Sequence, residues 1–151
     1  MSDEPYKQTF IVRWADIDAN GHMKNTAFLD TCVDVRFGYF ASRGFTAREF
    51  LGYQVGPVVR RDEADYHREL RFLDSYTVDI ALAGISDDAS RFAIRNRFYR
   101  ADGTLAASIV SIGGWLDLKD RRLVTPPEPL RRVLFALERV EEFRRFESSL
   151  R

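Results

Sequence analysis

A short stretch near the N-terminus combines residue types that can carry out acid–base or nucleophilic chemistry. Between Arg13 and Thr26 the chain reads RWADIDANGHMKNT, which places Asp18, His22 and Asn25 close together. The stretch joins an expected strand to an expected helix, and the first backbone N–H groups of a helix have no partner within it. Asp18 can act as base or nucleophile, His22 can orient or move a proton, and the amides near Asn25 can stabilise an oxyanion. This stretch is therefore the first candidate for a catalytic site.

Hydrophobic periodicity predicts the elements that hold this stretch in place. Residues 6–14 are expected to form a strand, and residues 26–40 a helix that is apolar on nearly every side. Such a helix is usually buried on most of its faces. Thr46 and Glu49 have the spacing of a capping box, which predicts a short helical turn at residues 46–51. Further strands are expected at residues 53–70, 76–85, 91–100 and 105–118.

The order of these elements is a strand, a buried helix and then four strands. The strands are joined by short turns, of which Asp102-Gly103 is a hairpin signal, so they are expected to pair antiparallel. This order predicts an α+β fold. After Pro126-Pro127, apolar residues recur at helical spacing, which predicts an amphipathic C-terminal helix over residues 127–147. We expect one domain over residues 1–151, in which residues 1–5 form a loose tail.

The composition narrows the classes of partner and compartment. Lysine plus arginine equals aspartate plus glutamate, at 23 each, so charge gives no reason to expect nucleic acid or an anionic membrane as partner. The single cysteine, Cys32, excludes an internal disulfide and suits a reducing compartment. The acidic start has no apolar run typical of a secretory signal, and no segment has the length of a membrane span. We therefore expect a cytoplasmic protein.

The residues that usually bind transition metals are few and poorly spaced. Only His22, His67 and Cys32 are available as soft ligands, and their separations match no known type of metal site. No metal and no other cofactor is expected.

Several motifs resemble those of one enzyme family. The pattern D-x-D-x-x-G-H-x-x-N at residues 16–25 resembles the active-site segment of hotdog-fold acyl-CoA thioesterases, in particular the 4-hydroxybenzoyl-CoA thioesterase-like branch. Residues 65–78, DYHRELRFLDSYTV, are similar to that family's Y-x-R-P-x-x-x-x-D-x-x-x-V junction, with Glu69 where proline is usual. The sequence GWLDL at residues 114–118, followed by two prolines, also fits. The resemblance covers about residues 6–130.

The resemblance implies a fold and a reaction. The fold would be a five-stranded antiparallel sheet wrapped around a long central helix, and the activity hydrolysis of a fatty-acyl or aryl thioester of coenzyme A. Asp18 would be the nucleophile or general base, Asn25 would supply the oxyanion amide, and His22 would position the thioester. The family places its site between subunits, which predicts a homodimer or homotetramer. Substrate contacts are expected from Arg60, Arg61, Arg68 and Tyr66, the arginines facing phosphates of coenzyme A.

Other residues and other functions remain open from the sequence. Asp34, Glu63 and Asp65 are reserve candidates for the catalytic carboxylate, and the alternative for Asp34 is an ion pair with Arg36 or another arginine. A hotdog enoyl-CoA hydratase is a second interpretation, but its D-x-N-P-x-H pattern has a proline and a histidine five residues after the aspartate, whereas His22 follows Asp18 by four. A non-catalytic acyl-CoA-binding module is the third, because a fold does not determine a function.

Overall fold

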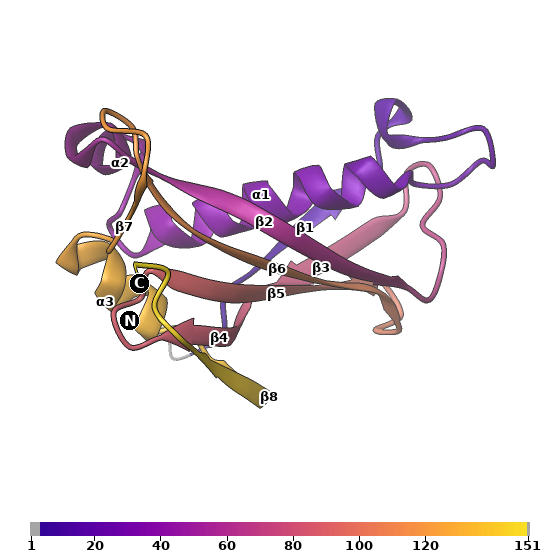
Figure 1. The fold of residues 1–151 in the computed structure, drawn as a ribbon. Coiled ribbons are helices and arrows are strands. Elements are labelled where there is room, and N and C mark those ends of the chain that lie inside the picture. Colours follow the sequence, from indigo (N-terminus) through magenta and orange to yellow (C-terminus); the bar gives the residue numbers. More distant parts are fainter. Residues whose placement is uncertain (1–3, 151) are drawn as a thin grey trace.

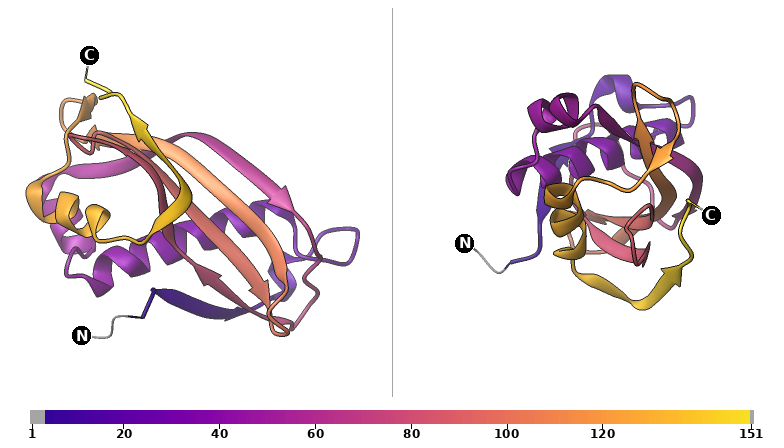
Figure 2. Two further views of the ribbon diagram at one scale, coloured as in Figure 1. Left: turned by 90° about the horizontal axis from the view of Figure 1, so that it is seen from below. Right: turned by 60° about the vertical axis from the view of Figure 1, so that its left-hand side comes forward.

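A long helix, α1 (Asn25–Ser42), lies along the inner face of a curved sheet in the computed structural model (Figure 1). The structure describes residues 4–150. The two views in Figure 2 show the sheet curving around this helix. The helix was expected over residues 26–40 and is slightly longer. Its apolar composition follows from its position, since much of its surface, including Phe28, Cys32 and Val35, is buried.

The sheet has eight strands in the described residues. Their bounds are β1 (Lys7–Ile11), β2 (Val55–Tyr66), β3 (Ser75–Asp79), β4 (Ala81–Ser86), β5 (Arg91–Arg100), β6 (Leu105–Asp117), β7 (Leu123–Val124) and β8 (Arg139–Phe146). Neighbouring strands follow the order β1, β3, β5, β6 and β2, all antiparallel. β4 also pairs with β5. The short β7 pairs antiparallel with β6, and β8 pairs parallel with β4. The α+β class is as expected.

The count of five strands was wrong, because one expected strand is divided and two more strands join the sheet. The strand expected at residues 76–85 is interrupted at Ile80, between β3 and β4. Beside the break, the Asp79 carbonyl accepts a hydrogen bond from the Asn96 side chain (2.8 Å), and its carboxylate accepts one from the Arg97 backbone N–H (2.8 Å). These bonds hold the chain at the point where it leaves one strand and enters the next.

The prediction of a C-terminal helix over residues 127–147 was also wrong in extent. Helix α3 (Glu128–Phe135) is only eight residues long, and the chain then forms β8, which runs parallel to β4. Val140 and Phe146 of β8 cover a small apolar patch on the outer face of the sheet. Pairing with the open edge of β4 and contact with this patch therefore favour a strand here, although the spacing of the apolar residues suits a helix.

The remaining terminal and capping features are short. Residues 1–3 of the expected N-terminal tail lie outside the described residues, and β1 begins two residues after Pro5. The expected helical turn is α2 (Ala47–Tyr53), where the Thr46 N–H donates to the Glu49 carboxylate at 2.8 Å. Within residues 4–150, no helix is both long and apolar enough to cross a lipid bilayer.

Aromatic packing fixes α1 against the sheet along its length. Near the start of the helix, the Phe28 and Phe98 rings lie 5.0 Å apart between centroids. Near its end, the Phe40 and Trp115 rings lie 6.1 Å apart. Burying one such side chain contributes about 1.5–3 kcal/mol, so these contacts hold both ends of the helix in place.

Two loops meet at the end of the sheet that lies away from both termini (Figure 1). One precedes α1 and the other joins β2 to β3. The Met23 N–H donates to the Leu70 carbonyl at 2.7 Å, and the Leu73 N–H donates to the Val12 carbonyl at 3.0 Å. These backbone bonds bring the first candidate stretch beside the end of β2.

Candidate active site

A cavity of about 400 Å³ opens where the two loops meet. Asp18, His22 and Asn25 line it from the loop and the helix start. The opposite wall comes from the end of β2 and the loop after it. The remaining lining residues are Met23, Phe28, Tyr66, His67, Arg68 and Glu69. All three predicted catalytic residues therefore face one cavity.

A tight turn brings Asp18 and His22 together. The Asp18 N–H donates to the His22 carbonyl (3.0 Å), and the Gly21 N–H donates to the Asp18 carbonyl (3.1 Å). Gly21 has φ +82°, a conformation that side-chain-bearing residues rarely adopt. The turn places His22 Nδ1 3.8 Å from Asp18 Oδ2, and both side chains are partly exposed. Asp18 Oδ1 accepts a hydrogen bond from the Asn20 N–H at 2.8 Å, which orients the carboxylate.

The start of α1 has free backbone donors, and its first residue, Asn25, lines the same cavity. Lys24 is the N-cap residue, and its side chain makes no capping hydrogen bond. Ala27 N–H donates back to the Lys24 carbonyl (3.0 Å), whereas the N–H groups of Asn25 and Thr26 have no protein acceptor within residues 4–150. A helix N-terminus carries about half a positive charge, so these donors favour an oxygen that gains negative charge.

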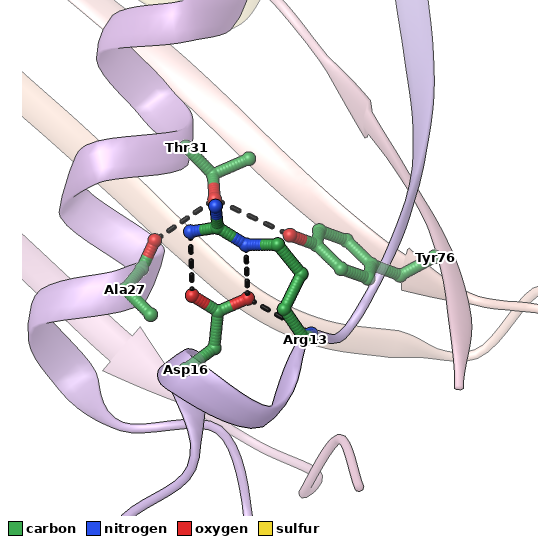
Figure 3. A network of polar contacts seen from close by, with 5 residues as sticks. All are labelled: Arg13, Asp16, Ala27, Thr31 and Tyr76. Carbon is green, nitrogen blue, oxygen red and sulfur yellow. Dashed lines mark hydrogen bonds and ion pairs between the residues drawn. The ribbon is translucent and has the colours of Figure 1, made fainter. Parts of the chain in front are cut away.

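A second carboxylate, Asp16, is buried and forms hydrogen bonds that hold the loop in place (Figure 3). Its side chain accepts hydrogen bonds from the Arg13 guanidinium and backbone N–H, and its carbonyl accepts one from the Lys24 N–H at 2.8 Å. The hydrogen bonds from Arg13 lower the pKa of Asp16. Beside this pair, the Thr31 hydroxyl donates to the Ala27 carbonyl at 2.8 Å. Asp16 therefore ties the start of the loop to the start of α1.

The predicted residues of β2 divide between the two faces of the sheet. Tyr66 packs edge-on against Phe28 of α1, with centroids 5.3 Å apart, so its side chain is on the helix-facing side. Successive strand residues point to opposite faces. Glu63 and Asp65 are therefore on the outer face, and neither lines the cavity. Asp62, which the sequence interpretation did not select, shares the helix-facing side with Tyr66.

Most of the other reserve and substrate-binding candidates do not line the cavity that contains Asp18. Asp34 is exposed on α1 and does not line the cavity. Arg61 forms an ion pair with Glu63 (3.2 Å). Arg60 lines a different cavity, next to Gly113 and Gly114 of β6. Of the three predicted arginines, only Arg68 lines the cavity that contains Asp18.

Four lining residues were not predicted as site residues: the apolar Met23 and Phe28, and two with titratable side chains. His67 and Glu69 flank Arg68 in the loop after β2. Glu69 is held by Arg71 through a 2.6 Å ion pair, whose hydrogen bond and charge lower the pKa of the carboxyl. The motif at residues 65–78 pointed to this loop, but its position beside Asp18 depends on backbone hydrogen bonds between distant segments, such as the one from Met23 to Leu70.

The titratable groups do not gather as a metal site would require. In the part of the chain that the structure describes, no group of three or more histidine, cysteine, aspartate or glutamate residues is arranged to hold a metal ion. Cys32 is buried in mid-helix, and burial raises the pKa of its thiol to about 12. It is therefore a core residue and not a nucleophile.

Solved structures of other proteins share this fold. A hypothetical protein of Staphylococcus aureus, solved in complex with CoA, aligns with a TM-score of 0.80 and 21% identity, covering 91% of this chain and 88% of that one. A 1,4-dihydroxy-2-naphthoyl-CoA thioesterase of Synechocystis gives a TM-score of 0.77 and 17% identity, with coverage of 89% and 98%. A gentisyl-coenzyme A thioesterase gives 0.76 and 17%, with coverage of 85% and 99%.

Comparison of sequences places the chain in a family. No curated protein matches it. A family model described as the thioesterase-like superfamily matches residues 12–134, which include the Asp18 turn, α1 and the strands from β2 to β7. The resemblance read from the motifs is confirmed at this level, and the hotdog-like fold agrees with it. The chain belongs to the thioesterase-like superfamily.

Proposed function

We propose that this protein is a thioester hydrolase that acts on an acyl-CoA. The observation that carries the proposal is the meeting of the Asp18 carboxylate and of Asn25, whose backbone N–H is free, in one cavity. Hydrolysis of a thioester needs a base or nucleophile on one side of the carbonyl carbon and donors for its oxygen on the other. The cavity supplies both.

Two routes are compatible with this arrangement. In the first, Asp18 attacks the carbonyl carbon, the thiolate of coenzyme A leaves and takes a proton, and water cleaves the resulting anhydride. In the second, Asp18 accepts a proton from a water molecule that attacks the same carbon. In both, the Asn25 N–H stabilises the oxyanion, and His22, 3.8 Å from Asp18, orients the carboxylate or the thioester. Neither route needs a cofactor.

Support for coenzyme A as the leaving group comes from the fold and from the cavity wall. Structurally similar proteins include one solved with CoA and two named as acyl-CoA thioesterases. Tyr66 and Arg68 line the cavity opposite Asp18, and a guanidinium is suited to phosphate. The acyl group, fatty or aryl, would contact Phe28.

We further propose a homodimer or a homotetramer with the site at the subunit interface. Within residues 4–150, β2 pairs with β6 on one side only, so its other edge is open. Val59 and Tyr66 on this strand remain 47% and 48% exposed. A long open strand with exposed apolar side chains favours pairing with a second chain. The end of that edge is the wall of the cavity.

The test is release of free thiol from short, long and aryl acyl-CoA thioesters by the wild type, Asp18→Asn and Asp30→Asn. Asp30 is an exposed carboxylate on α1 that does not line the cavity, which makes it the matched control. We expect turnover by the wild type and Asp30→Asn and its collapse in Asp18→Asn. Equal turnover by Asp18→Asn would remove Asp18 from the mechanism. Acyl-CoA binding without turnover of any thioester would identify a binding module instead.

A further inference from the structure

A second cavity, of about 210 Å³, lies between α1 and the beginning of β2, away from Asp18. Eight of its nine lining residues are apolar, among them Phe37, Phe40 and Trp115. The ninth is Arg36, whose side chain is almost fully buried. None of these residues lines the cavity that contains Asp18. The combination of an apolar wall with one buried cation requires an explanation.

Arg36 is held by neutral groups. Its Nε donates to the Asn96 side-chain oxygen (2.9 Å), and one terminal nitrogen donates to the Ser111 hydroxyl (2.6 Å). The Asn96 amide nitrogen donates to the Asp79 carbonyl (2.8 Å), so the amide oxygen is oriented toward the guanidinium. These contacts fix the position of the cation, but they bring no negative charge to it.

The nearest carboxylate in this hydrogen-bond network is Asp62, which is connected to Arg36 through Ser111. Ser111 donates its proton to Asp62, and within the described residues Arg36 has no ion pair of its own. A guanidinium has five N–H donors, and the two hydrogen bonds to Asn96 and Ser111 use two of them. A buried charge without a directly paired opposite charge is costly. An anionic ligand in the cavity would offset that cost.

Trp115, which lines this cavity, carries a second buried donor without a partner among the described residues. Its side chain is fully buried, and its indole N–H has no acceptor within residues 4–150. Buried indole N–H groups usually have a partner. The cavity volume equals about seven times the share of one water in the liquid, which suits a small apolar molecule.

We propose that this cavity binds a small apolar carboxylic acid, with the carboxylate on Arg36 and the hydrocarbon part against Phe37, Phe40 and Trp115. A carboxylate matches the fork of a guanidinium in shape and charge. Asp62 and Tyr66 are four residues apart on the helix-facing side of β2, so Arg36 lies about 13 Å along the strand from the Asp18 cavity. The site is therefore separate from the proposed hydrolytic one.

The chain offers its own reporter for this binding. It has two tryptophans, and Trp14 is 75% exposed at the other end of α1. In a Trp14→Phe background, the fluorescence therefore comes from Trp115 alone. The probes are octanoate and, as a neutral molecule of the same length, 1-octanol. We expect saturable octanoate binding that changes the Trp115 emission, with 1-octanol at least about tenfold weaker.

Variants separate the charge from the apolar cavity. Arg36→Met should weaken octanoate binding at least about tenfold and leave 1-octanol unchanged, and Arg36→Lys should recover part of the loss. Arg95→Met is the control, because Arg95 is a half-buried arginine on the outer face of the same sheet. If Arg36→Met does not fold, Val33→Phe narrows the cavity from an exposed wall position on α1 and should weaken octanoate binding. Absence of saturable octanoate binding, or equal binding by a folded Arg36→Met, would overturn the proposal.

Discussion

Arg13 and Asp16, at the start of the loop that carries Asp18, are joined by three hydrogen bonds. The Arg13 backbone N–H, Nε and one terminal nitrogen all donate to the Asp16 carboxylate, at 3.0, 3.2 and 2.9 Å. The Asp16 carbonyl accepts the Lys24 N–H, so the same residue contacts both ends of the loop. The carboxylate nearest to Asp18 in sequence therefore has a structural role, which leaves Asp18 as the carboxylate of this loop that faces the cavity.

Loss of the Asp16 charge should destabilise the protein in a pH-dependent way. The pKa of Asp16 is lower in the folded chain than in the unfolded one, because Arg13 hydrogen-bonds the ionised form. A lowered pKa gives stability that is present above the unfolded pKa of about 3.9 and is lost as pH falls below it. We expect Asp16→Asn to lower the free energy of unfolding by about 1–2 kcal/mol at pH 7.

Urea denaturation of the wild type and Asp16→Asn between pH 3 and pH 7 measures this effect. The gap between their unfolding free energies should narrow below about pH 4, where Asp16 of the unfolded wild-type chain takes up a proton while the folded chain still holds it ionised. Asp120→Asn is the control, because Asp120 is exposed and lies 3.9 Å from Arg122. It should change stability little at any pH. A gap between the wild type and Asp16→Asn that stays constant with pH would contradict a role for the charge.

Cys32 should be almost inert in the folded protein. Its side chain is 1% exposed, and burial raises the pKa of the thiol to about 12, compared with about 8.5 for a free cysteine. At pH 7.5 the thiolate is therefore at least about a thousandfold rarer than in the unfolded chain. Iodoacetamide labelling followed by mass spectrometry should show one modification in guanidinium chloride and none over the same time in buffer. An introduced cysteine in an exposed loop, Asp120→Cys, should react in both, and rapid labelling of native Cys32 would refute its burial.

Two glycines should respond in opposite ways to the same substitution. A Cβ atom on Gly113 of β6 would overlap the Val58 carbonyl oxygen of β2, whereas one on Gly52 of α2 would meet no atom within 4 Å. Gly113→Ala should therefore cost about 3 kcal/mol of unfolding free energy, because the two strands must separate. Gly52→Ala should stabilise by about 0.5–1 kcal/mol, since alanine favours the helix. Urea midpoints measure both, and a neutral Gly113→Ala would show that β2 and β6 can move apart easily.

The parts of the fold that local sequence controls were predicted well. The apolar run of α1 and the alternation in β5 each reflect one dominant neighbour, which is the core. The C-terminal segment was different: Val140, Phe143 and Phe146 recur every three residues, a spacing that suits a helix face. In the strand that forms instead, Val140 and Phe146 contact the outer patch while Phe143 packs against the main core. The choice depended on the open edge of β4, to which β8 pairs. That edge is made by residues 57 to 60 positions earlier, so no local pattern contains it.

The candidate site shows the same division. Asp18, His22 and Asn25 belong to one turn and one helix start, so their proximity follows from a few neighbouring residues. For Glu63 and Asp65, the decisive fact is which face of β2 they occupy. Residues 60–66 are mostly polar on both faces, so hydrophobic alternation does not indicate which of them face the helix. Only the pairing of β2 with β6 determines the face that each residue occupies.

The network around Arg36 could not be predicted from neighbouring residues at all. Its partners, Asn96 and Ser111, lie 60 and 75 positions later in the chain. An arginine in an apolar helix is a visible anomaly in the sequence, but its partners depend on how β5 and β6 pair beneath α1.

Removal of the Asn25 backbone N–H should test the oxyanion site directly. Asn25 is the first residue of α1, where proline is tolerated, because the lost N–H has no partner in the helix. Lys24 has φ −77° and ψ 154°, which is the conformation that a residue before proline prefers. Asn25→Pro should therefore fold normally while lacking this one donor.

We expect Asn25→Pro to lower kcat about 10²–10³-fold for the best acyl-CoA thioester, as loss of one oxyanion donor does in other hydrolases. Asn25→Ala removes the side chain and keeps the N–H, so it separates the two roles: a much smaller loss in Asn25→Ala assigns the effect to the backbone. Thermal unfolding of both variants verifies that α1 is intact. Equal losses in the two variants would assign the role to the Asn25 side chain, and unchanged turnover by a folded Asn25→Pro would move the oxyanion site away from this amide, leaving the Thr26 N–H as the donor at the helix start.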